Sequence, residues 1–182
     1  MMSPTPLRLT VAAARILCLF LLPGSVPLAV AGAARSAEPA PRSVVARLYR
    51  DYAWEAVLSN SNARQLLQQT RRELERYFTP HLAALIEREH LCAVRNRAPC
   101  ALDFQPHWNS DAPRAFSLAV AEAATPGEVT VTFSYADDAE PIHLTYLLQR
   151  TPRGWRISDL HTERWDLLRI LDAAAAPLRP SP

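Results

Sequence analysis

The spacing of apolar side chains divides the chain into a helical part and a strand part. From residue 43 to residue 91 apolar positions recur every three to four residues, the spacing of one buried helix face. This predicts a helix that begins at Ser43, a second helix after residues 59–62, and a third from Thr79-Pro80 to about Leu91. Thr is a good N-cap and Pro suits the first helical position. The side chains expected on the inner face of the second helix are Leu66, Leu67, Thr70, Leu74 and Tyr77.

Alternation of apolar and polar side chains replaces this spacing after residue 114. Strands are expected at residues 115–124, 128–135, 142–150 and 155–160. The last two form a hairpin in which Gly154 takes the positive φ that the turn needs. A closing helix from about Thr162 turns Trp165, Leu168 and Leu171 inward. Helices first and antiparallel strands second predict an α+β domain, with helices packed on one face of a curled antiparallel sheet.

The N-terminal apolar run has a different meaning. Arg8 and Arg15 precede the apolar residues 16–22, which Pro23-Gly24 ends, and small residues follow at 29–34. A positively charged N-terminal region, a short hydrophobic region and a cleavage site with small residues are typical of a cleaved secretory signal. The apolar stretch is too short for a membrane span, which needs about 20 apolar residues. The sequence therefore predicts a signal peptide at residues 1–37, a periplasmic or secreted protein, and no membrane span after cleavage.

Removal of this leader changes the length and the charge. The full chain has a net charge of +2, and loss of Arg8, Arg15 and Arg35 leaves 17 basic and 18 acidic residues, a net charge of about −1. About 145 residues remain, which is enough for one domain but not two. We expect a short tether at 38–42, a single domain at 43–172 and a flexible tail at 173–182.

Composition excludes several classes of site. The chain has no lysine, which removes Schiff-base chemistry and the lysine of a phosphate-binding loop. Only Gly127 and Gly154 follow the leader, so there is no glycine-rich phosphate loop, and no Gly-x-Ser-x-Gly motif occurs. A near-neutral domain has no electrostatic reason to bind nucleic acid. No cofactor is predicted.

Cys92 and Cys100 are the two cysteines that follow the leader. In an oxidising compartment they are expected to form a disulfide that closes a small ring. The alternative is a metal site, because His90, Asp103 and His107 lie close in sequence. Zinc ligand pairs usually lie two to four residues apart, whereas seven residues separate these cysteines. We therefore predict a disulfide and no metal.

Four stretches resemble a bacterial exported family known as domain of unknown function 3828. They are Leu48-Tyr49-Arg50-Asp51-Tyr52, Tyr77-Phe78-Thr79-Pro80-His81-Leu82, Leu102-Asp103-Phe104-Gln105-Pro106-His107-Trp108 and Gly154-Trp155-Arg156-Ile157-Ser158-Asp159. The order of helices, meander and last strand also resembles the nuclear-transport-factor-2-like cone. The resemblance covers about residues 43–171 and departs at Gln105, where an acidic residue is expected. It implies a cone-like fold and an exported location, and it carries no agreed activity.

Asp103 and Trp108 lie in a polar and aromatic segment that would cover the mouth of such a cone. One interpretation is that both side chains line a ligand pocket. The other is that Asp103 caps a turn before a proline while Trp108 fills the open end of the core.

Asp159 shares strand parity with Trp155 and Ile157, which predicts a carboxylate on the core face. A buried carboxylate is costly unless it is paired or hydrogen-bonded. Asp159 is therefore either a structural group or, as the resemblance to ketosteroid-isomerase-like cones implies, an acid or base in a cavity. The candidate partners of Asp159 are Tyr52, Tyr77, Tyr146 and several arginines. Tyr146, on the inner face of its strand, is also a predicted ligand contact.

These patterns favour a non-catalytic binding or protein-interaction module for an unknown small apolar ligand or envelope protein. The alternatives are a small cavity enzyme that uses Asp159 as acid or base, and an immunity-like inhibitor of an envelope-acting toxin. An interior filled by Trp and Tyr would favour protein interaction. An open cavity with Asp159 exposed in it would favour ligand binding or catalysis.

Overall fold

The computed structural model describes residues 40–58, 63–135 and 140–175. The expected leader at 1–37 lies outside these residues, as do residues 38–39 of the tether and most of the tail. The helical elements are α1 (Pro41–Tyr52), η1 (Ala53–Ala56), η2 (Leu66–Gln68), α2 (Arg71–Leu74), α3 (Pro80–Asn96) and α4 (Leu167–Ala175). The strands are β1 (Phe116–Glu122), β2 (Glu128–Ser134), β3 (Ile142–Thr151) and β4 (Gly154–His161). Within the described ranges, no helix is both long and apolar enough to cross a bilayer.

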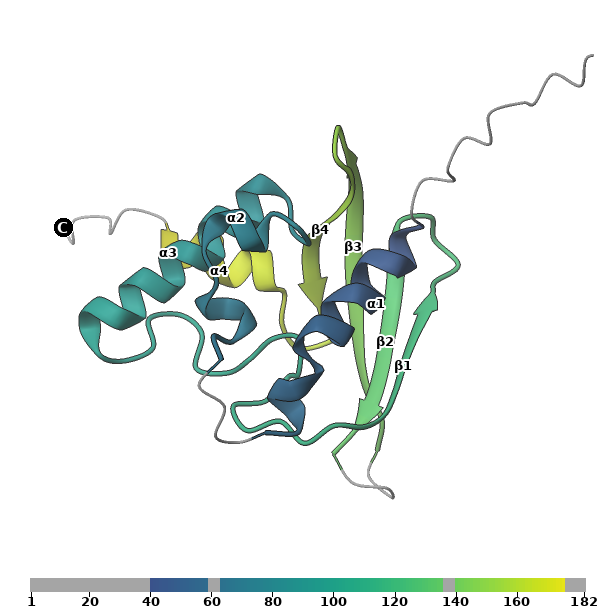
Figure 1. Cartoon of the computed structure of the whole chain (residues 1–182), viewed down its shortest axis with the longest axis horizontal. Coiled ribbons are helices and arrows are strands. Elements are labelled where there is room, and N and C mark those ends of the chain that lie inside the picture. Colours follow the sequence, from purple (N-terminus) through teal and green to yellow (C-terminus); the bar gives the residue numbers. More distant parts are fainter. Residues whose placement is uncertain (1–39, 59–62, 136–139, 176–182) are drawn as a thin grey trace, which may run out of the picture. The chain divides into compact units, whose positions relative to one another are not determined.

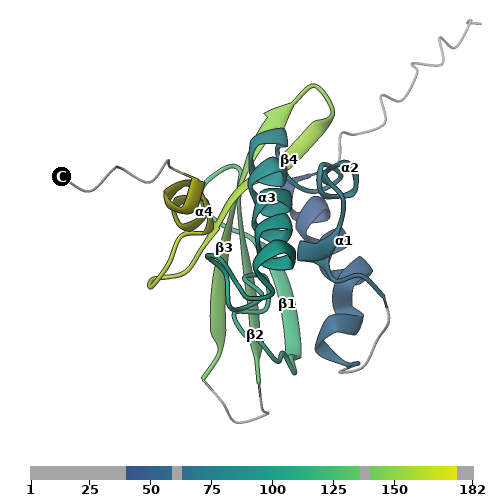
Figure 2. The same ribbon diagram turned by 90° about the vertical axis from the view of Figure 1, so that its left-hand side faces the viewer.

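The four strands form an antiparallel meander in the order β1-β2-β3-β4, with helices packed against one face (Figure 1). Helix α1 contacts β1, β2 and β4, whereas α3 and α4 pack against each other and against β4. Figure 2 shows the curl of the sheet and the helices from the side. The expected α+β class, with helices on a curled antiparallel sheet, is confirmed.

Alternation of side chains along the strands builds the core, as the sequence predicts. Val131 lies opposite Leu144, Val129 lies opposite Tyr146, and all four side chains are buried. Gly154 adopts φ 89° in the β3–β4 turn, which confirms the positive φ expected there.

Both edges of the sheet are partly protected. Beside β4, the Thr79 N–H donates to the Ile157 carbonyl, and the Ile157 N–H donates to the Tyr77 carbonyl, each at 2.8 Å. At the other edge the register of β1 shifts between Phe116 and Ala119. The Arg42 Nε–H donates to the Val120 carbonyl of the same strand at 2.8 Å. Irregularity and a charged side chain at an edge oppose the addition of a further strand.

The first helix begins earlier than the sequence suggests. Ala40 is the N-cap and Pro41 is the first residue of α1, so the expected tether ends before Pro41. Ser43 is not the N-cap. It lies inside the first turn, where its hydroxyl donates to the Ala40 carbonyl at 2.7 Å.

The predicted second helix is wrong as a continuous element. Residues 66–74 form the short helices η2 and α2 instead, because the Thr70 side chain accepts a hydrogen bond from the Glu73 N–H and starts a new helix. Thr70 is therefore exposed rather than inward, whereas Leu66, Leu74 and Tyr77 are buried as expected.

The boundaries of the last two helices also differ from those expected. Thr79 caps α3 as predicted, with its hydroxyl oxygen 3.3 Å from the Leu82 N–H donor, but this helix continues to Asn96. Helix α4 begins at Leu167 rather than near Thr162.

Candidate functional site

Aromatic side chains fill the space between α1 and the sheet. Trp108 is 1% exposed, and its ring packs edge-on against Tyr49 and Phe133 at centroid distances of 5.1 and 5.7 Å. The Tyr49 hydroxyl donates to the His107 carbonyl at 2.6 Å and lies 2.8 Å from the Tyr146 hydroxyl. Burial raises the pKa of Tyr49 and of Tyr146, so both phenols stay protonated at neutral pH. Trp108 and Tyr146, two of the predicted ligand contacts, therefore belong to a packed and hydrogen-bonded core.

Asp159 connects the end of β4 to the start of α4. Its Oδ1 accepts hydrogen bonds from the N–H groups of Leu160 at 2.7 Å and Leu168 at 2.9 Å, and the residue is 6% exposed. These bonds satisfy Oδ1 and order the chain between strand and helix. The geometry is that of a structural carboxylate.

A pH-dependent prediction follows from this environment. Burial raises the pKa of Asp159 above its ordinary value and Asp166 adds to the rise, while the two backbone N–H groups oppose it. A carboxyl with a raised folded-state pKa contributes stability that is complete below its unfolded pKa of about 4 and is lost as pH rises through the folded value. Asp159→Asn removes this loss, because the amide oxygen can still accept the two hydrogen bonds.

Urea unfolding at several pH values from about 3 to about 7 measures the effect. We expect the stability of Asp159→Asn, relative to that of the parent protein, to increase with pH across this range. Glu122→Gln, which alters an exposed carboxylate on β1, is the matched control and should show no such trend. A difference between Asp159→Asn and parent that stays constant with pH would contradict the raised pKa.

A buried hydrogen-bonded pair, Glu55 and His107, joins η1 to the segment before β1. Glu55 Oε2 lies 2.8 Å from His107 Nε2, and Glu55 Oε1 accepts a hydrogen bond from the Leu66 N–H at 2.6 Å. Glu55 is 6% and His107 2% exposed. The pair fixes three segments of chain around one carboxylate, in a place where water does not reach it.

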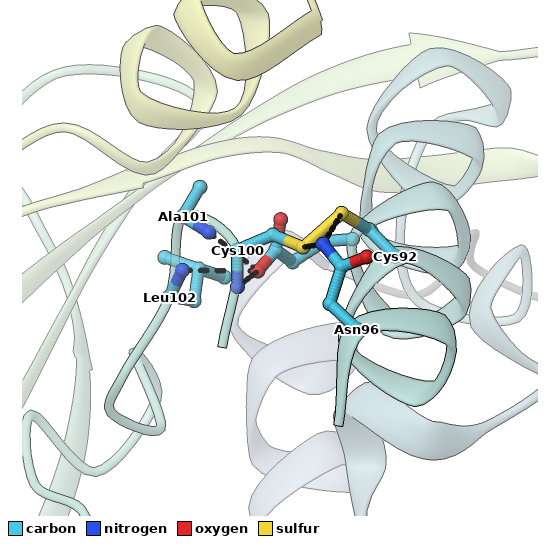
Figure 3. Close-up of a disulfide and its surroundings, with 6 residues drawn as sticks. Cys92, Asn96, Cys100, Ala101 and Leu102 are labelled. Carbon is cyan, nitrogen blue, oxygen red and sulfur yellow. Dashed lines mark hydrogen bonds between the residues drawn. A yellow bond between two sulfur atoms is a disulfide. The ribbon is translucent and has the colours of Figure 1, made fainter. Parts of the chain in front are cut away.

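The disulfide expected from the sequence is present and is reinforced by a carboxylate. Cys92 on α3 is bonded to Cys100, and the Asn96 side-chain amide donates to the Cys100 sulfur at 3.1 Å. Glu89 Oε1, one turn before Cys92, accepts hydrogen bonds from the N–H groups of residues 100–102 at 2.7–3.2 Å (Figure 3). Disulfide and carboxylate together hold the segment after α3 against that helix. No group of three potential metal ligands occurs within the described residues.

A groove of about 350 Å³ lies between η2, α3 and the segment that follows the disulfide. Its apolar lining consists of Leu67, Ile86, Ala93, Pro99, Leu102 and Phe104. Its polar lining consists of Gln65, Gln68, Glu89, His90, Asp103, Gln105 and Asp111. This volume is at the lower end of the range for ligand sites, and the mixture of apolar walls with a few polar groups is usual for them.

The acidic residues of the groove are hydrogen-bond acceptors. Asp103, a predicted ligand contact, is exposed and lines it together with exposed Asp111. Neither carboxylate is recorded with a hydrogen bond or ion pair to another described residue. The Gln105 Oε1 atom is buried and likewise has no hydrogen-bond partner there. The backbone of Gln105 is fixed, because its N–H donates to the Ser110 carbonyl at 2.8 Å.

A second hollow, of about 680 Å³, is also lined by Phe104. Its charged lining is mixed, with Glu140 and Glu163 beside Arg164. It therefore presents no single charge to a ligand, and the smaller groove is the better candidate site.

Sequence reasoning found one residue of this groove and missed the rest. Asp103 was expected at a pocket, whereas Gln105 was noticed only as a departure from the resemblance. Asp111 and Glu89 were not predicted as site or bracing residues. A glutamate one turn before a helical half-cystine is a usable signal for Glu89, because its side chain can reach the N–H groups that follow the second cysteine. Nothing local marks Glu55 as the partner of His107.

Comparisons with known proteins give no family. No family model matches the chain, and no curated protein matches it. A solved protein of unknown function from Bacteroides thetaiotaomicron is similar with a TM-score of 0.43 at 13% identity, covering 67% of this chain and 88% of that one. A phospholipid-binding protein from Ralstonia solanacearum, solved with a phospholipid, is similar with a TM-score of 0.31 at 15% identity, covering 73% of this chain and 72% of that one. At these scores neither likeness carries an argument about function.

Proposed function

We propose that the protein is an exported, non-catalytic binding module that recognises another protein through the groove beside the disulfide. The observation that carries this proposal is the filled interior, in which Trp108 occupies the space under the sheet between Tyr49 and Phe133. A small apolar ligand inside the fold would need that space. Recognition is therefore assigned to the outside of the fold, where the groove is a recessed feature that combines apolar walls with acidic groups.

A catalytic role for Asp159 receives no support from the geometry. The Asp159 Oδ1 atom already accepts two backbone hydrogen bonds, and the residue is buried at the junction of β4 and α4. A general acid or base must reach the proton that it transfers. The groove lies elsewhere, between η2 and α3, and its lining does not include Asp159.

The walls of the groove are held in place by strong local interactions. The Cys92–Cys100 disulfide and Glu89 fix the start of the 99–111 segment, and the Glu55–His107 pair fixes its middle. A preorganised site loses less conformational entropy when a partner binds. Rigid walls are what a protein-binding groove needs, since they let side chains from the partner enter without remodelling the fold.

Site-specific photo-crosslinking tests this proposal. A photoreactive amino acid is placed at Gln68, which is exposed and lines the groove, in a chain that retains its leader. The matched control carries it at Gln149, which is exposed on β3 and outside the groove lining. We expect the exported protein to form a defined adduct from position 68 and none from position 149.

Asp103→Arg, which reverses a charge in the groove, should abolish the adduct from position 68 while the thermal unfolding curve stays unchanged. Adducts that form equally from both positions, or that persist with Asp103→Arg, would contradict a partner seated in the groove. Retention of the chain in the cytoplasm with an uncleaved leader would contradict export.

A further inference from the structure

We infer that the groove accepts a basic side chain, arginine or lysine, from an extended segment of the partner protein. This inference rests on the proposed function and names the chemistry that the same groove selects. The groove lining contains the carboxylates of Glu89, Asp103 and Asp111 and no arginine. His90 is the one lining residue that can become cationic. The lining therefore favours a positively charged occupant and disfavours an anion.

The hydrogen-bonding capacity of the groove points the same way. Asp103 and Asp111 are exposed acceptors that have no hydrogen-bond or ion-pair partner among the described residues. Ammonium and guanidinium groups carry several N–H donors and no acceptor. The exposed carboxylates of Asp103 and Asp111 can accept hydrogen bonds from such a group.

Glu89 has a different part in this arrangement. Its Oε1 is occupied by the N–H groups of residues 100–102, which keeps the carboxylate in position against the wall. It therefore adds negative charge to the groove, while Asp103 and Asp111 remain available for direct contact. Because Glu89 braces the wall and the two aspartates make the contact, the groove can bind a cation without loosening the disulfide-bonded segment.

The apolar walls suit the rest of a long basic side chain. Leu67, Ile86 and Phe104 line the groove beside the acceptors. Lysine and arginine pack their methylene stems along apolar surface while the charged group contacts polar partners. A volume of about 350 Å³ accommodates one such side chain together with parts of its neighbours in an extended segment.

Matched peptides test the requirement for positive charge. The probe is acetyl-Leu-Arg-Leu-amide, and its control is the same peptide with citrulline, which keeps the shape of arginine and removes the charge. Each is titrated into 15N-labelled exported protein while backbone amide NMR signals are followed. We expect the arginine peptide to shift the signals of Gln68, Phe104 and Asp111 saturably. The citrulline peptide should bind at least about five-fold more weakly, and added salt should reduce the difference.

Variants of the groove complete the test. Asp103→Asn combined with Asp111→Asn should remove the preference for arginine over citrulline, whereas Glu122→Gln, an exposed neutralisation on β1, should keep it. Equal binding of both peptides, or shifts confined to residues outside the groove, would overturn the inference. If the crosslink from position 68 persists in the double variant, the binding module stands and the basic side chain is rejected. If no position-68 adduct forms, the proposed function fails, and the peptide titration still decides whether the groove selects cations.

Discussion

Replacing Glu55 by alanine should lower the free energy of unfolding by about 2–6 kcal/mol, because it leaves two buried hydrogen-bonding groups unsatisfied, at about 1–3 kcal/mol each. The change leaves His107 Nε2 and the Leu66 N–H without the carboxylate oxygens that lie 2.8 and 2.6 Å away. Both groups are shielded from water, since Glu55 is 6%, His107 2% and Leu66 1% exposed. Water therefore cannot replace the lost hydrogen bonds without opening the fold.

Glu73→Ala is the matched control because it removes a glutamate from an equally short ion pair at the surface. Glu73 lies 3.0 Å from Arg76, but their side chains are 43% and 57% exposed, so the loss should stay below about 1 kcal/mol. Urea unfolding of both variants gives the comparison. A double variant with His107→Ala should lose less stability than the sum of the single changes, because it also removes the imidazole that Glu55→Ala leaves without a partner. If Glu55→Ala lowers the free energy of unfolding by no more than Glu73→Ala does, the buried pair stabilises the fold no more than the surface pair.

The strands could be predicted from sequence because their signal is local. In β2 the alternation of Val129, Val131 and Phe133 with threonines places each residue on its face without knowledge of the rest of the chain. Gly154 marks the hairpin in the same local way. Fold class follows from such segments taken in order.

The second helix was predicted wrongly because spacing alone does not locate an interruption. Leu66, Leu74 and Tyr77 are buried as the helical period suggests, yet two short helices with two extended residues between them satisfy the same burial. The Thr70 cap decides the outcome, since a threonine oxygen near the Glu73 N–H competes with helix continuation.

The candidate site was predictable only where one residue carried its own signal. Asp103 is recognisable as a carboxylate in an aromatic segment. The disulfide is predictable because Cys92 and Cys100 are the two cysteines that follow the expected leader. By contrast, Glu55 and His107 are 52 residues apart, and only the tertiary fold brings them together. Trp108 shows most clearly what sequence alone does not decide, because its sequence context is compatible both with a pocket wall and with a core position.

Trp108→Ala should lower the free energy of unfolding by about 3–5 kcal/mol, the range found when a large buried aromatic side chain is deleted. The indole ring is 1% exposed and contacts both Tyr49 and Phe133. Its removal leaves a cavity that these rings cannot fill, since Tyr49 is held by hydrogen bonds to the His107 carbonyl and to Tyr146. The loss therefore combines hydrophobic transfer with the cost of the cavity.

Two further variants test whether the loss of stability comes from the buried position of the ring rather than from removal of any tryptophan. Trp108→Phe should lose much less stability than Trp108→Ala, because an aromatic ring remains and the indole Nε1 has no partner among the described residues. Trp54→Ala, at a half-buried position beside the core, should also lose less. Chemical unfolding of the three variants measures these differences, and NMR signals of Phe104 and Asp111 report on the groove. If Trp108→Ala unfolds like the parent protein, the ring does not fill the core. The interior would then be open to a ligand, and the assignment of binding to the outer groove would lose its main support.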